Sequence, residues 1–355
     1  MIGLQSTTAM RLGIVMRADP ERPEEAGGVL NPAVARGPDA TLHLFPRLVD
    51  AKGSSRIGHA RVRFDEAGTP VGVERLGIAL EPQEPYELRP QSGDGGCEDP
   101  RITYVEPLRC YIMAYCAFGP EGARVALARS DDLESWERLG LVDFEPRQDP
   151  VYRVDFDNYY NKDGVLFPDS VVAPDGQQAL TLLHRPTYDR ASKPASVEDP
   201  RPAIWISYCP LSEVLRDPRA LRQMRQHQVL IEPEFAWEAQ YIGGGTPPIR
   251  TAEGWLLLYH GVRHQELPPG DGRKPLRYSA GALLLDADDP RIVRYRSPQP
   301  VLQPDAPAEQ EGSVAGAVFP TGLDDRGEGR IDIYYGMADA RIGVARLELP
   351  TLLLT

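Results

Sequence analysis

The chain has 355 residues, of which 41% are hydrophobic and 26% charged, and its formal net charge is −13. This composition is ordinary for a globular protein, and the acidic balance argues against a nucleic-acid or anionic-membrane partner, which would need a basic face. Met1–Pro20 carries no signal-peptide core, and no apolar run approaches the ~18 residues of a membrane span. The four cysteines form no CxxC pair, so we expect reduced thiols in a cytoplasmic protein; a homo-oligomer is compatible with the sequence.

Five segments share one pattern, an apolar strand, a polar connection and a second strand. The first strands begin near residues 42, 111, 180, 255 and 331, about 70 residues apart. Partner strands are expected at 56–62, 124–128, 203–208, 281–285 and 341–347, and outer strands at 71–76, 136–142, 228–231 and 292–295. A regular period of strand-rich units is typical of propellers and other radial repeats.

A proline-bearing lead-in precedes each first strand, near residues 31, 99, 167, 246 and 319. One helix is expected at 211–226, interrupted by Pro218, so the regular crossover helices of a parallel β/α fold are missing. A β-sandwich is the alternative, but it would not explain five lead-ins in register. We therefore predict an all-β fold, with residues 1–355 forming a single five-bladed β-propeller.

The stretch Gly95–Arg101 places Asp99 between Glu98 and a Pro-Arg pair. Pro100 fixes its own φ and should push Asp99 toward an extended conformation, which would aim its carboxylate in one direction. A rigidly aimed carboxyl is what general acid catalysis needs. An isolated Asp-Pro-Arg is more often a surface turn, but here the same construction recurs along the chain.

Equivalent positions in different blades of a propeller converge on its axis. Polar residues of this kind, from the lead-ins and the ends of the first strands, are Asn31, Asp99, Asp163, Arg47, Arg185, His260 and Asp339. Tyr115, Phe167, Tyr259, Tyr278, Tyr334 and Tyr335 are candidates for flat apolar walls. This mixture suits a sugar, which presents hydroxyl groups and C–H faces. No cysteine joins His260 and His264, so we expect neither a metal nor a cofactor.

Seven motifs in order resemble glycoside hydrolase family 130, which comprises β-mannoside phosphorylases and related mannosidases with five-bladed propellers. They are Asn31-Pro32-Ala33, Ser55–Gly58, Glu98–Arg101, Lys162–Pro168, His184-Arg185-Pro186, Tyr259–Val262 and Tyr335–Asp339. The resemblance implies an inverting enzyme in which Asp99 is the general acid and delivers its proton through the sugar 3-hydroxyl. It further implies that Arg56, Arg101 and Asp339 hold the mannose ring, and that Arg185, His260 and Tyr278 belong to a phosphate-binding cluster.

The nucleophile side departs from the family pattern. Two cationic positions of the cluster fall on Tyr159 and Tyr241, which should weaken the binding of a divalent anion. Water would then be the nucleophile, activated by Glu238 or Asp157, whereas Arg153 and Lys162 are available to restore the charge. Hydrolysis and phosphorolysis to mannose 1-phosphate, with inorganic phosphate as co-substrate, both remain open at this point. The alternative from another class is a propeller that binds carbohydrate without catalysis. The insertion 264–276 is expected to overhang the pocket.

Overall fold

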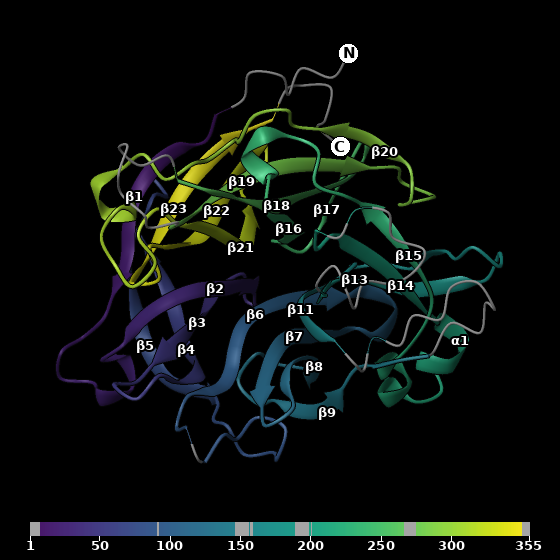
Figure 1. The fold of residues 1–355 in the computed structure, drawn as a ribbon, viewed down its shortest axis with the longest axis horizontal. Helices are drawn as coiled ribbons and strands as arrows, with labels where there is room; N and C mark the ends of the chain where they lie inside the picture. The colour runs from purple at the N-terminus through teal and green to yellow at the C-terminus, as the bar shows by residue number, and fades with distance from the viewer. Residues whose placement is uncertain are drawn as a thin grey trace.

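The computed structural model describes residues 8–90, 92–145, 156, 159–188, 199, 201–265 and 275–349. Within these ranges β-strands dominate, joined by turns, short 3-10 segments and one short α-helix, α1 (Leu211–Val214) (Figure 1). No helix of the described ranges has the length and apolar character that crossing a membrane requires.

Within the described ranges the main strands form five antiparallel groups of four, of which four follow the chain and the fifth is completed by β1. Figure 1 shows the groups arranged in turn around the middle of the molecule. Group 1 contains β2 (Gly28–Arg36), β3 (Leu42–Val49), β4 (Ser54–Phe64) and β5 (Pro70–Leu80). Group 2 contains β6 (Gly95–Val105), β7 (Cys110–Gly119), β8 (Gly122–Ser130) and β9 (Glu137–Leu141). Two parallel residue pairs between β4 and β6 join these two groups into one sheet.

The remaining groups repeat this order. Group 3 contains β11 (Tyr160–Leu166), β13 (Gln178–Thr187), β14 (Ile204–Pro210) and β15 (Gln223–Ile231), with β10 (Asp143–Phe144) and β12 (Val171–Val172) paired to it. Group 4 contains β16 (Tyr241–Gly244), β18 (Gly254–His264), β19 (Leu276–Leu285) and β20 (Val293–Arg296), with β17 (Ile249–Thr251) paired to β18. Group 5 contains β21 (Val318–Asp325), β22 (Arg330–Met337), β23 (Arg341–Glu348) and, from the other end of the chain, β1 (Met10–Arg17).

The predicted strands are confirmed, but their order within a group is corrected. The predicted first strands are the second strands of their groups, because the lead-ins around residues 31, 99 and 319 are themselves strands. Pro168 and Pro248 follow β11 and β16, so they are not equivalent to Pro32 and Pro100 inside β2 and β6. The predicted helix stops at Val214; a 3-10 segment begins at Pro218, and residues from 223 onward join β15.

Asn31, Asp99 and Asp163 occupy bulges in the innermost strands β2, β6 and β11. Their φ angles are 44°, 48° and 56°, so the prediction of an extended Asp99 is wrong. A bulge carries an extra residue that leaves the ladder, and Asn and Asp are the side chains that best tolerate the left-handed conformation. The proline after Asn31 or Asp99 fits there, because a bulge is where a strand accepts a residue without a backbone N–H.

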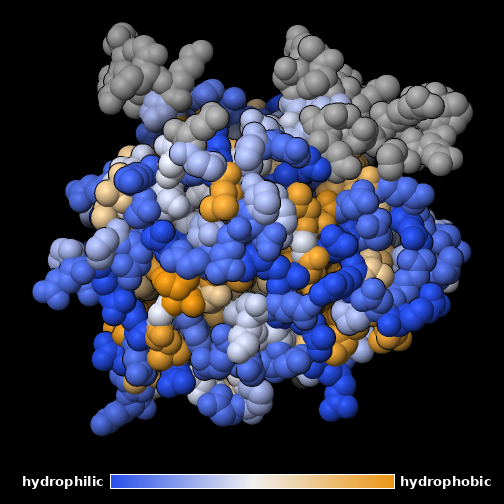
Figure 2. Space-filling model, turned by 90° about the horizontal axis from the view of Figure 1, so that it is seen from below, coloured by the Kyte–Doolittle hydropathy of each residue, from blue (hydrophilic) through white to orange (hydrophobic). Residues whose placement is uncertain are grey.

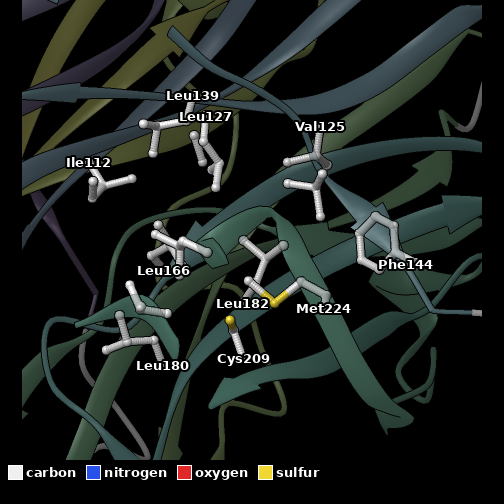
Figure 3. Packing of buried hydrophobic residues seen from close by; sticks show 14 of the residues in the cluster. Ile112, Val125, Leu127, Leu139, Phe144, Leu166, Leu180, Leu182, Cys209 and Met224 are labelled. Atoms are coloured by element: carbon white, nitrogen blue, oxygen red, sulfur yellow. The ribbon is translucent and has the colours of Figure 1, made fainter. Parts of the chain in front are cut away.

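Five hydrophobic clusters of described residues pack the groups together, each between two neighbouring groups. Figure 3 shows the cluster between groups 2 and 3, in which Ile112 and Leu127 face Leu166 and Leu182. Similar clusters join groups 1 and 2, groups 3 and 4, and groups 4 and 5. The fifth cluster joins group 5 back to group 1, where Tyr334 and Val344 pack with Val29 and Leu44. The core therefore runs continuously through all five groups.

A buried glutamate fixes the segment in front of several groups. Glu238 accepts hydrogen bonds from Tyr259 Oη at 2.5 Å and Arg296 Nη2 at 2.6 Å, and from the backbone N–H groups of residues 234 and 235. The same arrangement of a glutamate, a tyrosine of the second strand and an arginine of the outer strand recurs in other groups. The equivalent sets are Glu87, Tyr115 and Arg138 in group 2 and Glu309, Tyr335 and Arg11 in group 5. Each set ties an inter-group segment to its sheet.

The prediction of aromatic cavity walls is wrong for all its residues except Tyr278, because the others are engaged elsewhere. Tyr115, Tyr259 and Tyr335 donate to buried glutamates, while Phe167 and Tyr334 lie within the hydrophobic clusters.

The outer face seen in Figure 2 is largely hydrophilic, with hydrophobic residues in small separate patches.

Candidate active site

A cavity of about 300 Å³ lies where the five groups meet. It is lined by Asn31, Arg47, Asp99, Tyr160, Lys162, Asp163, Arg185, Thr187, Tyr241, His260, Tyr278, Val314, Ala317, Phe319 and Asp339. Residues of all five groups contribute, and the list contains most of the predicted polar residues. The structure thus brings together side chains that are up to 308 residues apart, from Asn31 to Asp339.

The Asp99 carboxylate is held by donors from group 1. Asp99 Oδ1 accepts hydrogen bonds from Asn31 Nδ2 at 2.8 Å and Arg47 Nη1 at 3.2 Å. Burial acts to raise the pKa of Asp99, but the charges of Arg47 and Arg101 and the Asn31 hydrogen bond outweigh it, so the pKa lies below its usual value. Asp99 is 8% exposed, so its carboxylate is aimed and ionised in the absence of substrate.

Arg101 lies beneath the cavity and does not line it, although it was expected to contact substrate. Its guanidinium donates to the carbonyl oxygens of Asp99, Gly244 and Gly245 and lies 3.3 Å from Asp163 Oδ1. Gly243 lets Asp163 approach β16 closely, because a Cβ at this position would lie 2.3 Å from Asp163 Oδ2. Arg101 therefore positions both aspartates from below.

Asp163 contacts the basic side chains that groups 3 and 4 bring to the cavity. Its Oδ2 accepts a 2.6 Å hydrogen bond from Arg185 Nε and lies 3.7 Å from His260 Nε2. Burial acts to raise the pKa of Asp163, but the charges of Arg185, His260 and Arg101 lower it well below its usual range. Arg185 Nη1 also donates a 3.0 Å hydrogen bond to Thr187 Oγ1, and the guanidinium stacks over the ring of Tyr241.

His260 is 1% exposed, and neither of its ring nitrogens has a hydrogen-bond partner among the described residues. Its ring packs against Phe319, with the centroids 4.5 Å apart. Burial lowers the pKa of His260 to about 4, so the imidazole is neutral near pH 7. Beside it, the hydroxyl groups of Tyr241 and Tyr278 share a 2.6 Å hydrogen bond. A buried, unpartnered imidazole facing a cavity is a ready partner for a polar ligand atom.

Asp339 is the second carboxylate on the Asp99 side of the cavity. It follows β22 and has a φ of 49°. Burial raises its pKa to about 6, helped by the charges of Asp99 and Glu98 and opposed by Arg47. Two carboxyl groups in one cavity thus have pKa values shifted in opposite directions, and Asp339 holds a proton more readily than Asp99 in the free enzyme.

Several predicted residues are not brought to the cavity. Glu238 is fully buried in its contacts with Tyr259 and Arg296, which removes it as a base facing the cavity. Arg56 pairs with Glu81 at 2.7 Å and does not line the cavity. Tyr159 packs beside Tyr188 and the cluster between groups 2 and 3. Arg153, Asp157 and residues 266–274 of the expected overhang lie outside the described residues.

The prediction missed Tyr160, Thr187, Val314, Ala317 and Phe319, and treated Lys162 only as a reserve charge. The alternation of side chains along a strand would have found Tyr160, which is two residues before Lys162 and therefore on the same face. Lys162 Nζ lies 3.7 Å from Glu98 Oε2 and contributes a third cation to the cavity wall.

One group of side chains has metal-ligand chemistry among the described residues, His43, His59 and Glu134. His43 Nδ1 and His59 Nε2 are hydrogen-bonded to each other at 2.7 Å, so these nitrogens are engaged. Neither histidine lines the cavity, so this group has no part in its chemistry.

An all-β scaffold with a cavity of opposed carboxylates, guanidinium groups and hydroxyl groups is that of a carbohydrate-active enzyme. The model of glycoside hydrolase family 130, described as β-1,4-mannooligosaccharide phosphorylase, matches residues 5–353. A 1,2-β-oligomannan phosphorylase of Thermoanaerobacter sp. (strain X514) is 30% identical over 342 residues, covering 94% of this chain and 95% of that protein. A β-1,2-mannobiose phosphorylase of the same organism is 30% identical over 301 residues, covering 83% and 77%.

The solved structure of a β-1,2-mannobiose phosphorylase from Listeria innocua, in complex with β-1,2-mannobiose, superimposes with a TM-score of 0.68 at 24% identity and covers 96% of each chain. The chain belongs to glycoside hydrolase family 130, and is an enzyme of the glycosidase and glycoside phosphorylase kind.

Proposed function

We propose that the five strand groups are the blades of one β-propeller that spans residues 1–355 as a single catalytic domain. The continuous ring of five core clusters supports this, because only a closed arrangement gives the last group a neighbour in the first. β1 supports it as well, since it completes the last group with a strand from the start of the chain. The cavity then lies at the axis.

We further propose that the enzyme cleaves β-mannosides with inversion and transfers the mannosyl group to inorganic phosphate. One observation carries this. The cavity has an aimed carboxylate, Asp99, on groups 1 and 2, and a separate set of donors, Arg185, His260 and Tyr278, on groups 3 and 4. An inverting transfer needs a proton donor and a nucleophile site on different sides of the sugar ring.

In this reaction Asp99, which is ionised in the free enzyme, takes up a proton as substrate binds and then acts as the general acid. The proton passes through the sugar 3-hydroxyl to the departing oxygen. The C1–O bond to the leaving sugar breaks as an oxygen of phosphate forms a bond to C1, giving α-mannose 1-phosphate. Asn31, Arg47, Asp163 and Asp339 are placed to bind mannose hydroxyl groups, with Arg101 supporting Asp99 and Asp163 from below. Arg56, near the start of β4 and outside the cavity lining, stays a predicted mannose ligand.

The donors on groups 3 and 4 suit a phosphate. Arg185 offers a guanidinium, neutral His260 offers one ring N–H, and burial raises the pKa of Tyr278 well above its usual value, which keeps its hydroxyl protonated. Lys162 lines the same cavity and adds a cation next to β13. The curated relatives of similar length that the chain resembles act as phosphorylases, which supports phosphate as the nucleophile.

Hydrolysis is the second candidate, favoured by the charge balance around Arg185. Asp163 lies 2.6 Å from Arg185 Nε and neutralises it, while tyrosines occupy positions 159 and 241 where cations were expected. This would lower the affinity for a divalent anion. A water nucleophile would need a base, and Glu238 is not available for that role.

The experiment is product analysis with β-1,2-, β-1,3- and β-1,4-mannobiose, with and without inorganic phosphate. Phosphorolysis predicts mannose 1-phosphate, formed as the α anomer and only with phosphate present. Free mannose, produced at the same rate in both conditions, would establish hydrolysis instead. Binding of mannobiose with no turnover in either condition would reduce the protein to a carbohydrate-binding propeller.

We propose that the reaction needs no metal and no organic cofactor, with an oligosaccharide and phosphate as the only small-molecule partners. The four cysteines are buried and unpaired, which supports a reducing, cytoplasmic location.

A further inference from the structure

We propose that Tyr160 is the aromatic platform on which the leaving saccharide packs at the mouth of the cavity, which makes it a specificity-determining residue. This rests on the proposed cleavage of β-mannosides and extends it to the part of the substrate beyond the mannose. Its position on β11 and its surroundings assign this role to Tyr160.

Tyr160 is more exposed than the other aromatic residues that line the cavity. The residue is 52% exposed. The rings of Tyr241, Tyr278 and Phe319 lie deeper and are packed against His260 or one another. An exposed ring at a cavity wall offers a face that is free to receive a ligand, whereas the deeper rings form the wall itself.

The ladder between β11 and β13 sets the distance of this ring from the chemistry. Lys162 pairs with Arg185, and Tyr160 pairs with Thr187 two residues further out. All four side chains line the cavity, as the alternation of strand side chains requires. A strand rises about 3.3 Å per residue, so Tyr160 lies roughly 7 Å outward from the Lys162–Arg185 pair. That offset is about the span of one pyranose ring.

The Tyr160 ring is held in place by Gly122 at the start of β8. A Cβ at Gly122 would lie 2.0 Å from Tyr160 Cε1, so the ring rests directly on a backbone that has no side chain. The φ of Gly122 is +90°, a conformation that glycine adopts readily. A ring supported on one face and open to the cavity on the other is preorganised for packing against the C–H face of a sugar.

The test compares two substrates that share the mannose but differ in the leaving group. β-Mannobiose has a saccharide leaving group, and β-mannosyl fluoride has none beyond the halide. Tyr160→Ala should lower kcat/KM for mannobiose about tenfold, the order expected for losing one aromatic packing contact, and change kcat/KM for the fluoride less than twofold. Tyr160→Phe keeps the ring face and should behave like the wild type.

Two further variants separate the platform from a general effect on folding. Gly122→Ala displaces the ring while leaving the tyrosine in place, so it should reproduce the selective loss on mannobiose. Tyr104→Ala removes another exposed tyrosine, which is 38% exposed and lies outside the cavity lining. It should leave kcat/KM unchanged for both substrates. Thermal unfolding of each variant verifies that the comparison is made on folded protein.

The outcomes distinguish the role of Tyr160 from the proposed cleavage of β-mannosides. An equal loss on both substrates, or no loss on either, in folded Tyr160→Ala would overturn the platform while the wild-type turnover upholds the proposed function. Wild-type protein that turns over neither substrate would refute the proposed function, and the platform with it.

Discussion

Asn31 Nδ2 donates a 2.8 Å hydrogen bond to Asp99 Oδ1, and so joins equivalent bulges of two neighbouring strand groups. Both residues are in the left-handed conformation, with φ values of 44° and 48°. The direction of the Asp99 carboxylate therefore depends on a residue 68 positions earlier in the chain. The Asp99 carboxylate is aligned by side chains of group 1 packed on group 2, in addition to Arg101 of its own strand.

Asn31→Gly should weaken catalysis without disturbing the bulge. Glycine accepts the positive φ, so the backbone is kept while the amide donor is lost. A hydrogen bond to a charged group contributes about 1.5–3 kcal/mol, so kcat/KM should fall roughly ten- to hundredfold. Because the lost donor stabilises the ionised form, the pKa of Asp99 should rise, which an NMR titration of its carboxyl carbon measures. An unchanged pKa would show that Asn31 does not act on Asp99.

Asp99→Asn should abolish most of the activity. Removing a general acid typically costs on the order of 10²–10⁴ in rate, and asparagine retains the shape of the side chain but supplies no acidic proton. The measurement is the initial rate of mannobiose cleavage, with Asp169→Asn as a matched control on an exposed aspartate. If Asp99→Asn retains more than a tenth of the wild-type rate, another group is the proton donor.

Asp339→Asn should make the protein more stable above pH 6 and less active. The pKa of Asp339 is raised to about 6, above its value in the unfolded chain, so the ionised carboxyl destabilises the folded state at high pH. As pH falls through 6 the folded protein takes up the proton and the penalty disappears. The gain in Tm of the variant should therefore be largest near pH 8 and vanish near pH 4. A gain that is independent of pH would contradict this origin.

Glu238→Gln should cost stability but little activity per folded molecule. The change removes the carboxylate that Arg296 contacts at 2.6 Å and leaves it Glu234 at 3.5 Å, and breaking a buried ion pair typically costs up to about 3–5 kcal/mol. Glu309→Gln, which breaks the equivalent contact with Arg11, is the matched control and should destabilise the protein less, because the Arg11 side chain is 31% exposed and that of Arg296 9%. Urea unfolding and kcat measured together separate the two roles. A Glu238→Gln protein of normal stability with a hundredfold lower kcat would restore Glu238 as a catalytic base.

The second and third strands of each group were predictable because their apolar character follows from burial between neighbouring groups. The innermost strands were recognised only as lead-ins, since a bulge, a proline and a polar residue such as Asn31 interrupt their alternation. β1 was not predicted at all. Its partner, β23, lies more than 300 residues away, and pairing over that distance leaves no local pattern in the sequence.

The site was predictable where equivalent positions in the repeat carry polar residues, as for Asp99, Asp163 and Arg185. The prediction of Glu238 as a base was wrong, because a buried structural glutamate and a catalytic one look alike in sequence until their partners are known. Tyr160 could not be predicted, because no polar chemistry marks an aromatic platform. Its role depends on facing the cavity and on the absence of a side chain at Gly122.

The pairing of β1 with β23 has a consequence for biosynthesis. The strand Met10–Arg17 is synthesised more than 300 residues before its hydrogen-bonding partner, Arg341–Glu348. The groups between them have local partners and are able to form hairpins during translation, whereas the pairing of β1 has to wait until β23 has been made. Until then the edge of β1 is open to pairing with other chains. The nascent chain is therefore exposed to aggregation and chaperone binding at this edge for the time that those residues take to be synthesised.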